Sequence, residues 1–114
     1  MRTALIVDDD YGIAELLQRV LRRCGFAPRI AASLRDVAEA LNEVGQLDLV
    51  VLDWNIPTAE EGAQALALLR SRHPNASVVL SSGENVDQPT AAGLPRLAKP
   101  YRPSDVRACL VQLG

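Results

Sequence analysis

The chain alternates between two hydrophobic periods. Short, continuous apolar runs at residues 3–7, 48–52, 76–80 and 94–98, and a weaker one at 26–32, are typical of strands that are buried on both faces. Between them, apolar residues recur at spacings of three and four, which is the pattern of an amphipathic helix. Because strands and helices alternate, we predict an α/β fold with a five-stranded parallel sheet and helices on both faces.

The helical pattern follows every apolar run except the one at 76–80. Gly25 lies where the first helix would end, and Ser33 with Asp36 forms a capping-box-like start of the second. The last helix would begin at Pro103. The four stripes are Ile13, Leu16, Leu17, Val20 and Leu21; Leu34, Val37, Ala38 and Leu41; Gly62, Ala65, Leu66 and Leu69; and Val106, Cys109, Leu110 and Leu113.

Composition excludes several classes of protein. The length of 114 residues and the hydrophobic share of 48% predict one soluble domain over residues 1–114. A net charge of −2 provides no general attraction to nucleic acid or to acidic lipid, so we expect neither as a direct partner. No signal peptide or membrane-length apolar run is present, and Cys24 and Cys109 lack metal-ligand spacing. We expect a cytoplasmic protein with reduced thiols.

Charged residues follow three of the predicted strands where each strand ends. Asp8 and Asp9 come directly after the run at 3–7, Asp53 after the run at 48–52, and Lys99 after the run at 94–98. The carboxyl ends of parallel strands share one edge of a sheet, and ligands bind there. Clustered carboxylates repel one another, so the sequence predicts a Mg²⁺ site beside a lysine. Asp10 is either a member of this cluster or a solvated loop residue.

Four motifs in this order resemble the receiver domain of bacterial two-component response regulators. They are VDDD at 7–10, LDWNIP at 52–57, VVLSSG at 78–83 and AKP at 98–100, and the resemblance covers essentially the whole chain. It implies a flavodoxin-like sheet with the strand order 2-1-3-4-5. It also implies a phosphorylated signalling switch that catalyses only its own phosphorylation and dephosphorylation.

The resemblance assigns a role to each matching acid. Asp53 matches the residue that accepts a phosphoryl group from a phosphohistidine of a sensor kinase or phosphotransfer protein. Asp9 and Asp53 match direct Mg²⁺ ligands, Asp8 matches the acid that holds a metal-bound water, and the backbone carbonyl of Asn55 completes the protein's ligands. The downstream partner, like the kinase and the stimulus, is not specified by the sequence.

Two further residues match groups that contact the phosphoryl group. Lys99 matches the cation that neutralises the charge of the transferred group. Ser82 matches the hydroxyl that bonds a phosphoryl oxygen after transfer, because Gly83 then falls where the family has a small residue; Ser81 is the alternative. Pro100 follows the lysine as in the family, where that peptide bond is commonly cis.

The chain departs from the family pattern in the segment before Lys99. Arg96 stands where the family usually has a switching aromatic residue, and Tyr101 is expected to be a packing residue. Only sixteen residues separate Ser82 from Lys99 (99 − 82 − 1). This is too few for a full fourth helix, which we expect to be short or missing, as in a mostly single-domain group of alphaproteobacterial receivers. A stand-alone receiver is expected, unless an output domain has been removed.

Two other interpretations use the same types of residue. A haloacid-dehalogenase-type phosphohydrolase also combines an Asp nucleophile, Mg²⁺, a Ser or Thr and a Lys, and Asp8 with Asp10 would supply its D-x-D motif. However, its later metal-binding acid follows the hydroxyl residue and the lysine, whereas Asp53 precedes both Ser82 and Lys99. A pseudo-receiver that only binds partners is the second alternative, but such chains tend to lose an acid or the lysine, and here all are present.

Overall fold

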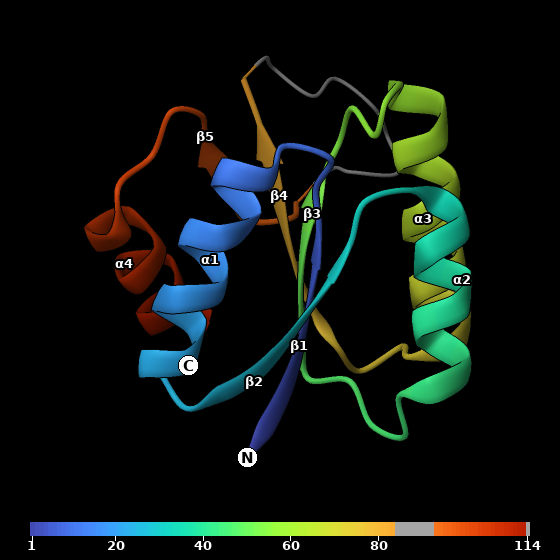
Figure 1. The fold of residues 1–114 in the computed structure, drawn as a ribbon, viewed down its shortest axis with the longest axis horizontal. Helices are drawn as coiled ribbons and strands as arrows, with labels where there is room; N and C mark the ends of the chain where they lie inside the picture. The colour runs from blue at the N-terminus through green and yellow to red at the C-terminus, as the bar shows by residue number, and fades with distance from the viewer. Residues whose placement is uncertain (84–92, 114) are drawn as a thin grey trace.

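Five parallel strands form one sheet with helices on both sides (Figure 1). The computed structural model describes residues 1–83 and 93–113. The order across the sheet is β2-β1-β3-β4-β5, so the predicted fold class and strand order are confirmed. The strands are β1 (Arg2–Val7), β2 (Phe26–Ala31), β3 (Leu49–Asp53), β4 (Ser77–Ser82) and β5 (Arg96–Ala98).

Among the described residues, two helices cover each face of the sheet. α1 (Tyr11–Arg23) and α4 (Pro103–Leu113) pack on one face, and α2 (Leu34–Glu43) and α3 (Ala59–Arg72) pack on the other (Figure 1). None of the described helices is long and apolar enough to cross a membrane. The predicted short or missing helix between β4 and β5 falls on residues 84–92, outside the described residues; α4 is the helix that follows β5.

Three helices begin at a polar side chain that accepts a backbone N–H of the first turn. The acceptors are Oδ1 of Asp10 for α1, Oγ of Ser33 for α2 and Oγ1 of Thr58 for α3, at N···O distances of 3.2, 3.1 and 3.2 Å. The predicted start at Ser33 is therefore confirmed. Asp10 has a structural role, because its side chain starts the helix that follows β1.

Strand side chains alternate between two buried layers. The layer under α1 and α4 contains Ala4, Ile6, Leu49, Val51, Val79 and Leu97, and the layer under α2 and α3 contains Leu5, Val7, Val50, Leu52, Val78 and Leu80. The predicted burial on both faces is confirmed. The alternation continues into the polar strand ends, so Asp53 and Ser81 fall on the α1 and α4 side and Ser82 on the other.

The predicted strand boundaries at 76–80 and 94–98 are wrong. β4 continues to Ser82 because backbone pairing extends beyond the apolar run, with Ser81 opposite Leu97 and Ser82 opposite Ala98 in β5. β5 begins later than expected, at Arg96. It ends at Ala98, as predicted, so Lys99 lies directly beyond the strand, near the carboxyl ends of β1 and β3.

Candidate functional site

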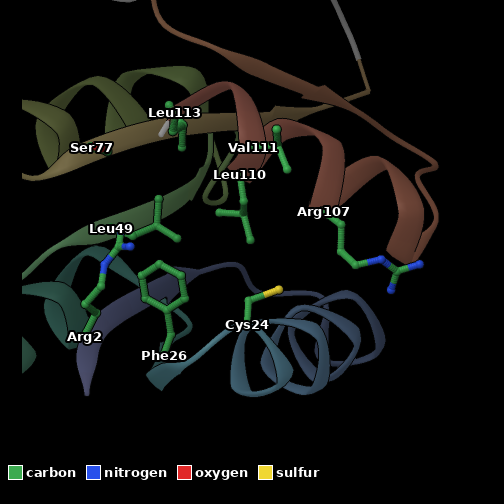
Figure 2. A pocket seen from close by; sticks show the side chains of 9 residues that line it. All are labelled: Arg2, Cys24, Phe26, Leu49, Ser77, Arg107, Leu110, Val111 and Leu113. Atoms are coloured by element: carbon green, nitrogen blue, oxygen red, sulfur yellow. The ribbon is translucent and has the colours of Figure 1, made fainter.

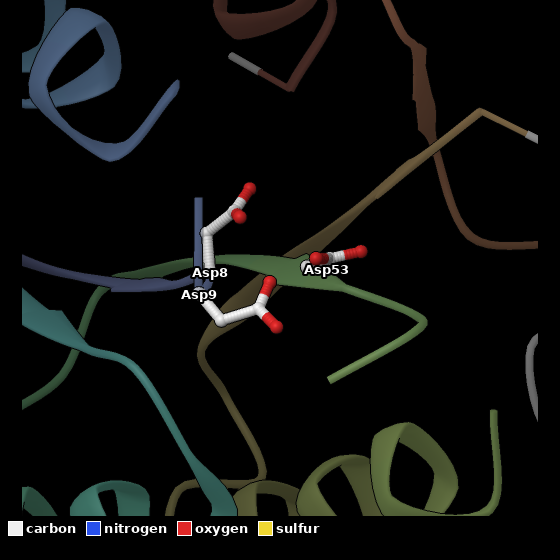
Figure 3. A group of neighbouring side chains, drawn as sticks. All are labelled: Asp8, Asp9 and Asp53. Carbon is white, nitrogen blue, oxygen red and sulfur yellow. The ribbon is translucent and has the colours of Figure 1, made fainter. Parts of the chain in front are cut away.

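Three carboxylates meet where β1 and β3 end. These strands are neighbours, and Val7 lies opposite Leu52. The next residue of each strand, Asp8 and Asp53, therefore lies beside the other. One oxygen each of Asp8, Asp9 and Asp53 lies within 4.8 Å of the other two. Figure 3 shows the three side chains grouped at this edge. The predicted acidic cluster therefore exists; Asp8 and Asp53 are buried, and Asp9 is exposed on its open side.

Lys99 joins two of these acids. Its Nζ atom lies 3.2 Å from Oδ2 of Asp8 and 3.4 Å from Oδ2 of Asp53. The Lys99 N–H donates to the carbonyl of Ser82 at 3.0 Å, which ties the lysine to the end of β4. The predicted convergence of the lysine with the acids is correct, and one ammonium group is shared by two buried carboxylates.

Lys99 compensates the negative charge of Asp53 only in part, because Asp8 shares the same ammonium group. Burial, together with the charge of Asp8, raises the pKa of Asp53 to about 6, although Lys99 and the N–H of Asn55 act in the opposite direction. Burial lowers the pKa of Lys99, but the charges of Asp8 and Asp53 outweigh burial and raise it overall, so the ammonium form persists. A second cation would remove the remaining imbalance.

The carboxylates have the donor set that a hard divalent cation prefers. Oδ1 of Asp8 accepts the N–H of Asp10 at 2.8 Å, and Oδ1 of Asp53 accepts the N–H of Asn55 at 3.2 Å. The buried Oδ2 of Asp8 accepts no hydrogen bond from the described residues and has only its ion pair with Lys99. A cluster of carboxylate oxygens fits a hard cation such as Mg²⁺ or Ca²⁺. The predicted role of the Asn55 carbonyl stays a prediction.

The two serines at the end of β4 have different surroundings. Ser81 is fully buried, lies opposite Asp53 in the register of β3 and β4, and donates a hydrogen bond from Oγ to Oη of Tyr101 at 3.2 Å. Ser82 is also buried, and its carbonyl binds the Lys99 N–H. Because consecutive strand residues point to opposite faces, only Ser81 is on the same side of the sheet as Asp53.

Tyr101 is a residue whose polar contact the sequence interpretation missed. Its ring packs against the core under α1 and α4, as expected for a packing residue, but its hydroxyl accepts the Ser81 bond. Burial is the main reason that its pKa is raised to about 12, so the phenol stays neutral. A buried tyrosine hydroxyl usually has a hydrogen-bond partner, which was the available signal.

Gly62 allows α3 to approach the loop after Asp53. A Cβ atom at this position would lie 1.9 Å from the carbonyl oxygen of Trp54, so no other residue fits without movement of the backbone. Trp54 is buried, and its N–H donates to the carbonyl of Ser81 at 3.1 Å. This contact fixes the backbone that follows the acidic cluster, and the sequence pattern alone did not reveal it. The Lys99–Pro100 peptide bond is cis, as the resemblance implied.

An apolar hollow of about 310 Å³ lies at the opposite end of the sheet (Figure 2). It is lined by the first residues of four strands, Arg2, Phe26, Leu49 and Ser77, together with Cys24 and the end of α4. No acid of the cluster lines it. The charged site therefore lies at the carboxyl ends of the strands, whereas the hollow lies at their amino ends.

Comparisons with known proteins identify the family. The model of the "Response regulator receiver domain" family matches residues 4–108. The chain is 32% identical over 111 residues to the "Uncharacterized transcriptional regulatory protein YbdJ" of Bacillus subtilis, covering 96% of the chain and 48% of that protein. The chain thus spans about half the length of YbdJ and only 17% of a putative NtrX-like response regulator of Rickettsia conorii, to which it is 34% identical over 80 residues (69% of the chain).

Solved structures share the fold. A response regulator from Burkholderia pseudomallei, described with a phosphorylated aspartic acid, a calcium ion and citrate, has a TM-score of 0.80 at 24% identity and covers 96% of this chain and 66% of its own. TrrA from Thermotoga maritima, in complex with Mg(2+)-BeF, has a TM-score of 0.82 at 21% identity and covers 100% of both chains. The narrower resemblance to alphaproteobacterial single-domain receivers stays a prediction.

The family match also favours the receiver interpretation over the phosphohydrolase. It spans the motifs that contain Asp8, Asp53 and Lys99, and the observed strand order is the one that the resemblance to receivers implied. The phosphohydrolase alternative is not supported. The chain belongs to the response regulator receiver domain family, whose members are phosphoacceptor signalling switches of two-component systems rather than metabolic enzymes.

Proposed function

We propose that Asp53 accepts a phosphoryl group from a phosphohistidine of a sensor histidine kinase or phosphotransfer protein, and that the added charge changes the binding of a downstream protein. The observation that carries the proposal is the sharing of Lys99 between Asp8 and Asp53. Buried carboxylates with an incomplete counter-charge and a perturbed pKa cluster at functional sites, which favours a reactive role for Asp53.

The chemistry follows from the groups around Asp53. With a pKa of about 6, the carboxylate is mainly ionised at neutral pH, so an oxygen can attack phosphorus as the bond from phosphorus to the histidine nitrogen breaks. The Lys99 ammonium then neutralises charge on the equatorial oxygens of the phosphoryl group. The product is an aspartyl phosphate held beside the lysine.

Mg²⁺ is the metal that we propose for the acidic cluster. Asp9 and Asp53 would bind it directly, Asp8 through a water molecule, and Asn55 through its backbone carbonyl. The exposed position of Asp9 and the lack of a hydrogen bond to Oδ2 of Asp8, which has only its ion pair with Lys99, support this assignment, and the Mg(2+) named for TrrA agrees with it. The ion would supply the positive charge that Asp53 lacks.

Ser82 is our proposal for the hydroxyl that bonds the transferred phosphoryl group. The alternative, Ser81, already donates its hydroxyl to Tyr101 and is fully buried. Ser82 ends β4 and shares a backbone hydrogen bond with Lys99, so a rearrangement of this strand end that turns the Ser82 side chain toward the phosphoryl group would bring its hydroxyl there.

The partners that we propose are proteins of a phosphorelay, and we propose a cytoplasmic location with them. Several relatives are named transcriptional regulatory proteins, but the chain covers half of their length or less. The net charge of −2 provides no general attraction to nucleic acid, so we propose no direct binding of nucleic acid by this part.

Phosphate mapping tests the proposal. The protein would be incubated with Mg²⁺ and acetyl phosphate, reduced with borohydride to trap the aspartyl phosphate, and analysed by peptide mass spectrometry. We expect one modified residue, Asp53, and no modification of Asp53→Asn. Asp48→Asn is the matched control, because Asp48 lies at the other end of the same strand. Modification of Asp53→Asn, or of Asp8 in the wild type, would contradict the proposal and favour phosphohydrolase chemistry.

A further inference from the structure

The connection between β5 and α4 carries Lys99 and is tied to the end of β4 by two hydrogen bonds. One is the backbone bond from Lys99 to the Ser82 carbonyl at 3.0 Å, and the other is the side-chain bond from Ser81 to Tyr101 at 3.2 Å. At its far end, the N–H of Arg102 binds Asp105 in the first turn of α4. The connection is therefore held on both sides of Tyr101.

The Ser81 end of the side-chain bond lies next to the reactive carboxylate. Ser81 is opposite Asp53 in the β3 and β4 register, on the same face of the sheet, and no part of it is exposed. The bond thus runs from the strand neighbour of Asp53 to the residue two positions after Lys99. Pro100 lies between Lys99 and Tyr101, and its ring fixes one of the backbone dihedrals that join them, which limits how far the two residues can move independently.

We infer that Ser81 and Tyr101 are a pair of positioning residues that hold the Lys99 ammonium over Asp53 during phosphoryl transfer. The inference rests on the proposed function of Asp53. Lys99 has a long side chain, and its Nζ must remain within ion-pair distance of both acids, at 3.2 and 3.4 Å, to act on the transferred group. Anchoring its backbone at two points restricts the positions that Nζ can reach.

A comparison of single and double variants separates a positioning role of this pair from a purely structural one. Tyr101→Phe leaves the fully buried Ser81 hydroxyl without its acceptor, which destabilises the fold. In Ser81→Ala/Tyr101→Phe both polar atoms are absent, and no buried hydroxyl is left unpaired. A purely structural pair would therefore recover both its stability and its rate in the double variant. A positioning pair would recover only its stability.

The experiment measures the rate of Asp53 phosphorylation against acetyl phosphate concentration in Mg²⁺, followed by intact mass, together with the urea midpoint of each variant. We expect Tyr101→Phe to lower the maximal rate about tenfold while the half-saturating concentration is unchanged. The double variant should keep the same low rate although its urea midpoint returns toward that of the wild type. Ser81→Ala provides the second measurement if Tyr101→Phe does not fold.

Two control variants remove the same atoms elsewhere. Tyr11→Phe removes an exposed phenol, and Ser77→Ala removes a hydroxyl at the other end of β4; both should retain the wild-type rate. Rates within about twofold of wild type in Tyr101→Phe, or a rate that recovers with stability in the double variant, would overturn the positioning role. A wild type that carries no label on Asp53 would refute the proposed function, and the inference with it; a labelled wild type with unaffected variants refutes the inference alone.

Discussion

Asp48 and Asp53 lie at opposite ends of β3. Asp48 immediately precedes the strand, where its Oδ2 accepts the N–H of Thr3 at 2.8 Å and its Oδ1 accepts the amide of Gln46 at 3.1 Å. Asp53 ends the strand, where it competes with Asp8 for Lys99 and its pKa is raised to about 6. The same side chain is structural where neutral donors satisfy it and reactive where another acid shares its counter-charge.

The two edges of the sheet repeat this contrast. At the edge where the strands begin, the guanidinium of Arg2 lies 4.6 Å from the ring centre of Phe26, beside the apolar hollow in Figure 2. At the edge where they end, the acids and Lys99 gather (Figure 3). A parallel sheet brings the same ends of all strands together. The reactive charges therefore gather at the carboxyl ends of the strands, and the residues at the amino ends serve packing.

The largest expected effect comes from removing the lysine. Lys99→Met should lower the rate of phosphorylation by about 10²- to 10³-fold, because no other described cation is paired with Asp53. The measurement is the rate of mass increase with acetyl phosphate. Arg2→Met is the matched control at the opposite edge and should retain the wild-type rate. Comparable losses in both variants would mean that the two edges do not differ as described.

A methyl group at Gly62 tests the backbone contact beside the site. Gly62→Ala should destabilise the fold by about 2 kcal/mol or more, because the new Cβ would lie 1.9 Å from the Trp54 carbonyl oxygen. Gly45→Ala is the control near the other edge, where a Cβ meets nothing within 4 Å. Urea unfolding measures both, and equal stability of the two variants would contradict the close approach of α3.

The pH dependence of stability should distinguish the two aspartates. The pKa of Asp53 rises on folding from 3.8 to about 6, so the folded state binds its proton more tightly, and this stabilisation is complete below about pH 4 and lost as the pH rises through 6. Asp53→Asn cannot ionise, and it should be more stable than the wild type by about 1 to 2 kcal/mol near pH 8.

The advantage of Asp53→Asn should disappear near pH 4, as measured by urea unfolding across this range. Asp48→Asn should instead be less stable than the wild type at neutral pH by about 0.5 to 1 kcal/mol, since its carboxylate accepts two hydrogen bonds. If Asp53→Asn is less stable than the wild type near pH 8, the negative charge of Asp53 is fully compensated in the folded protein, and the prediction is wrong.

A modest stabilisation is expected from Mg²⁺ on the unmodified protein. A concentration of ten times the Kd should stabilise the fold by about 1.4 kcal/mol and change the emission of Trp54, which follows Asp53 in the chain. Asp9→Asn should weaken both responses with little change of the fold, because Asp9 is exposed. Asp48→Asn should respond as the wild type does, and an undiminished response in Asp9→Asn would exclude Asp9 as a ligand.

Much of this arrangement is predictable from the amino-acid sequence. Apolar runs that are buried on both faces, alternating with helical stripes, are compatible with few folds other than a parallel sheet between helices. Once that sheet is assumed, Asp8, Asp53 and Lys99 must share an edge, since each directly follows a strand. The principal residues of the site were therefore predictable from short-range patterns alone.

Other features depended on which backbones lie side by side. The hydrophobic run ends at residue 80, but β4 continues through Ser81 and Ser82 because β5 pairs with it. No pattern within the chain shows that Ser81 lies opposite Asp53, that its hydroxyl binds Tyr101, or that Gly62 touches Trp54. Burial and periodicity are local properties of a sequence, whereas the register of strands and the approach of a helix depend on packing between distant segments, and only the tertiary structure decided them.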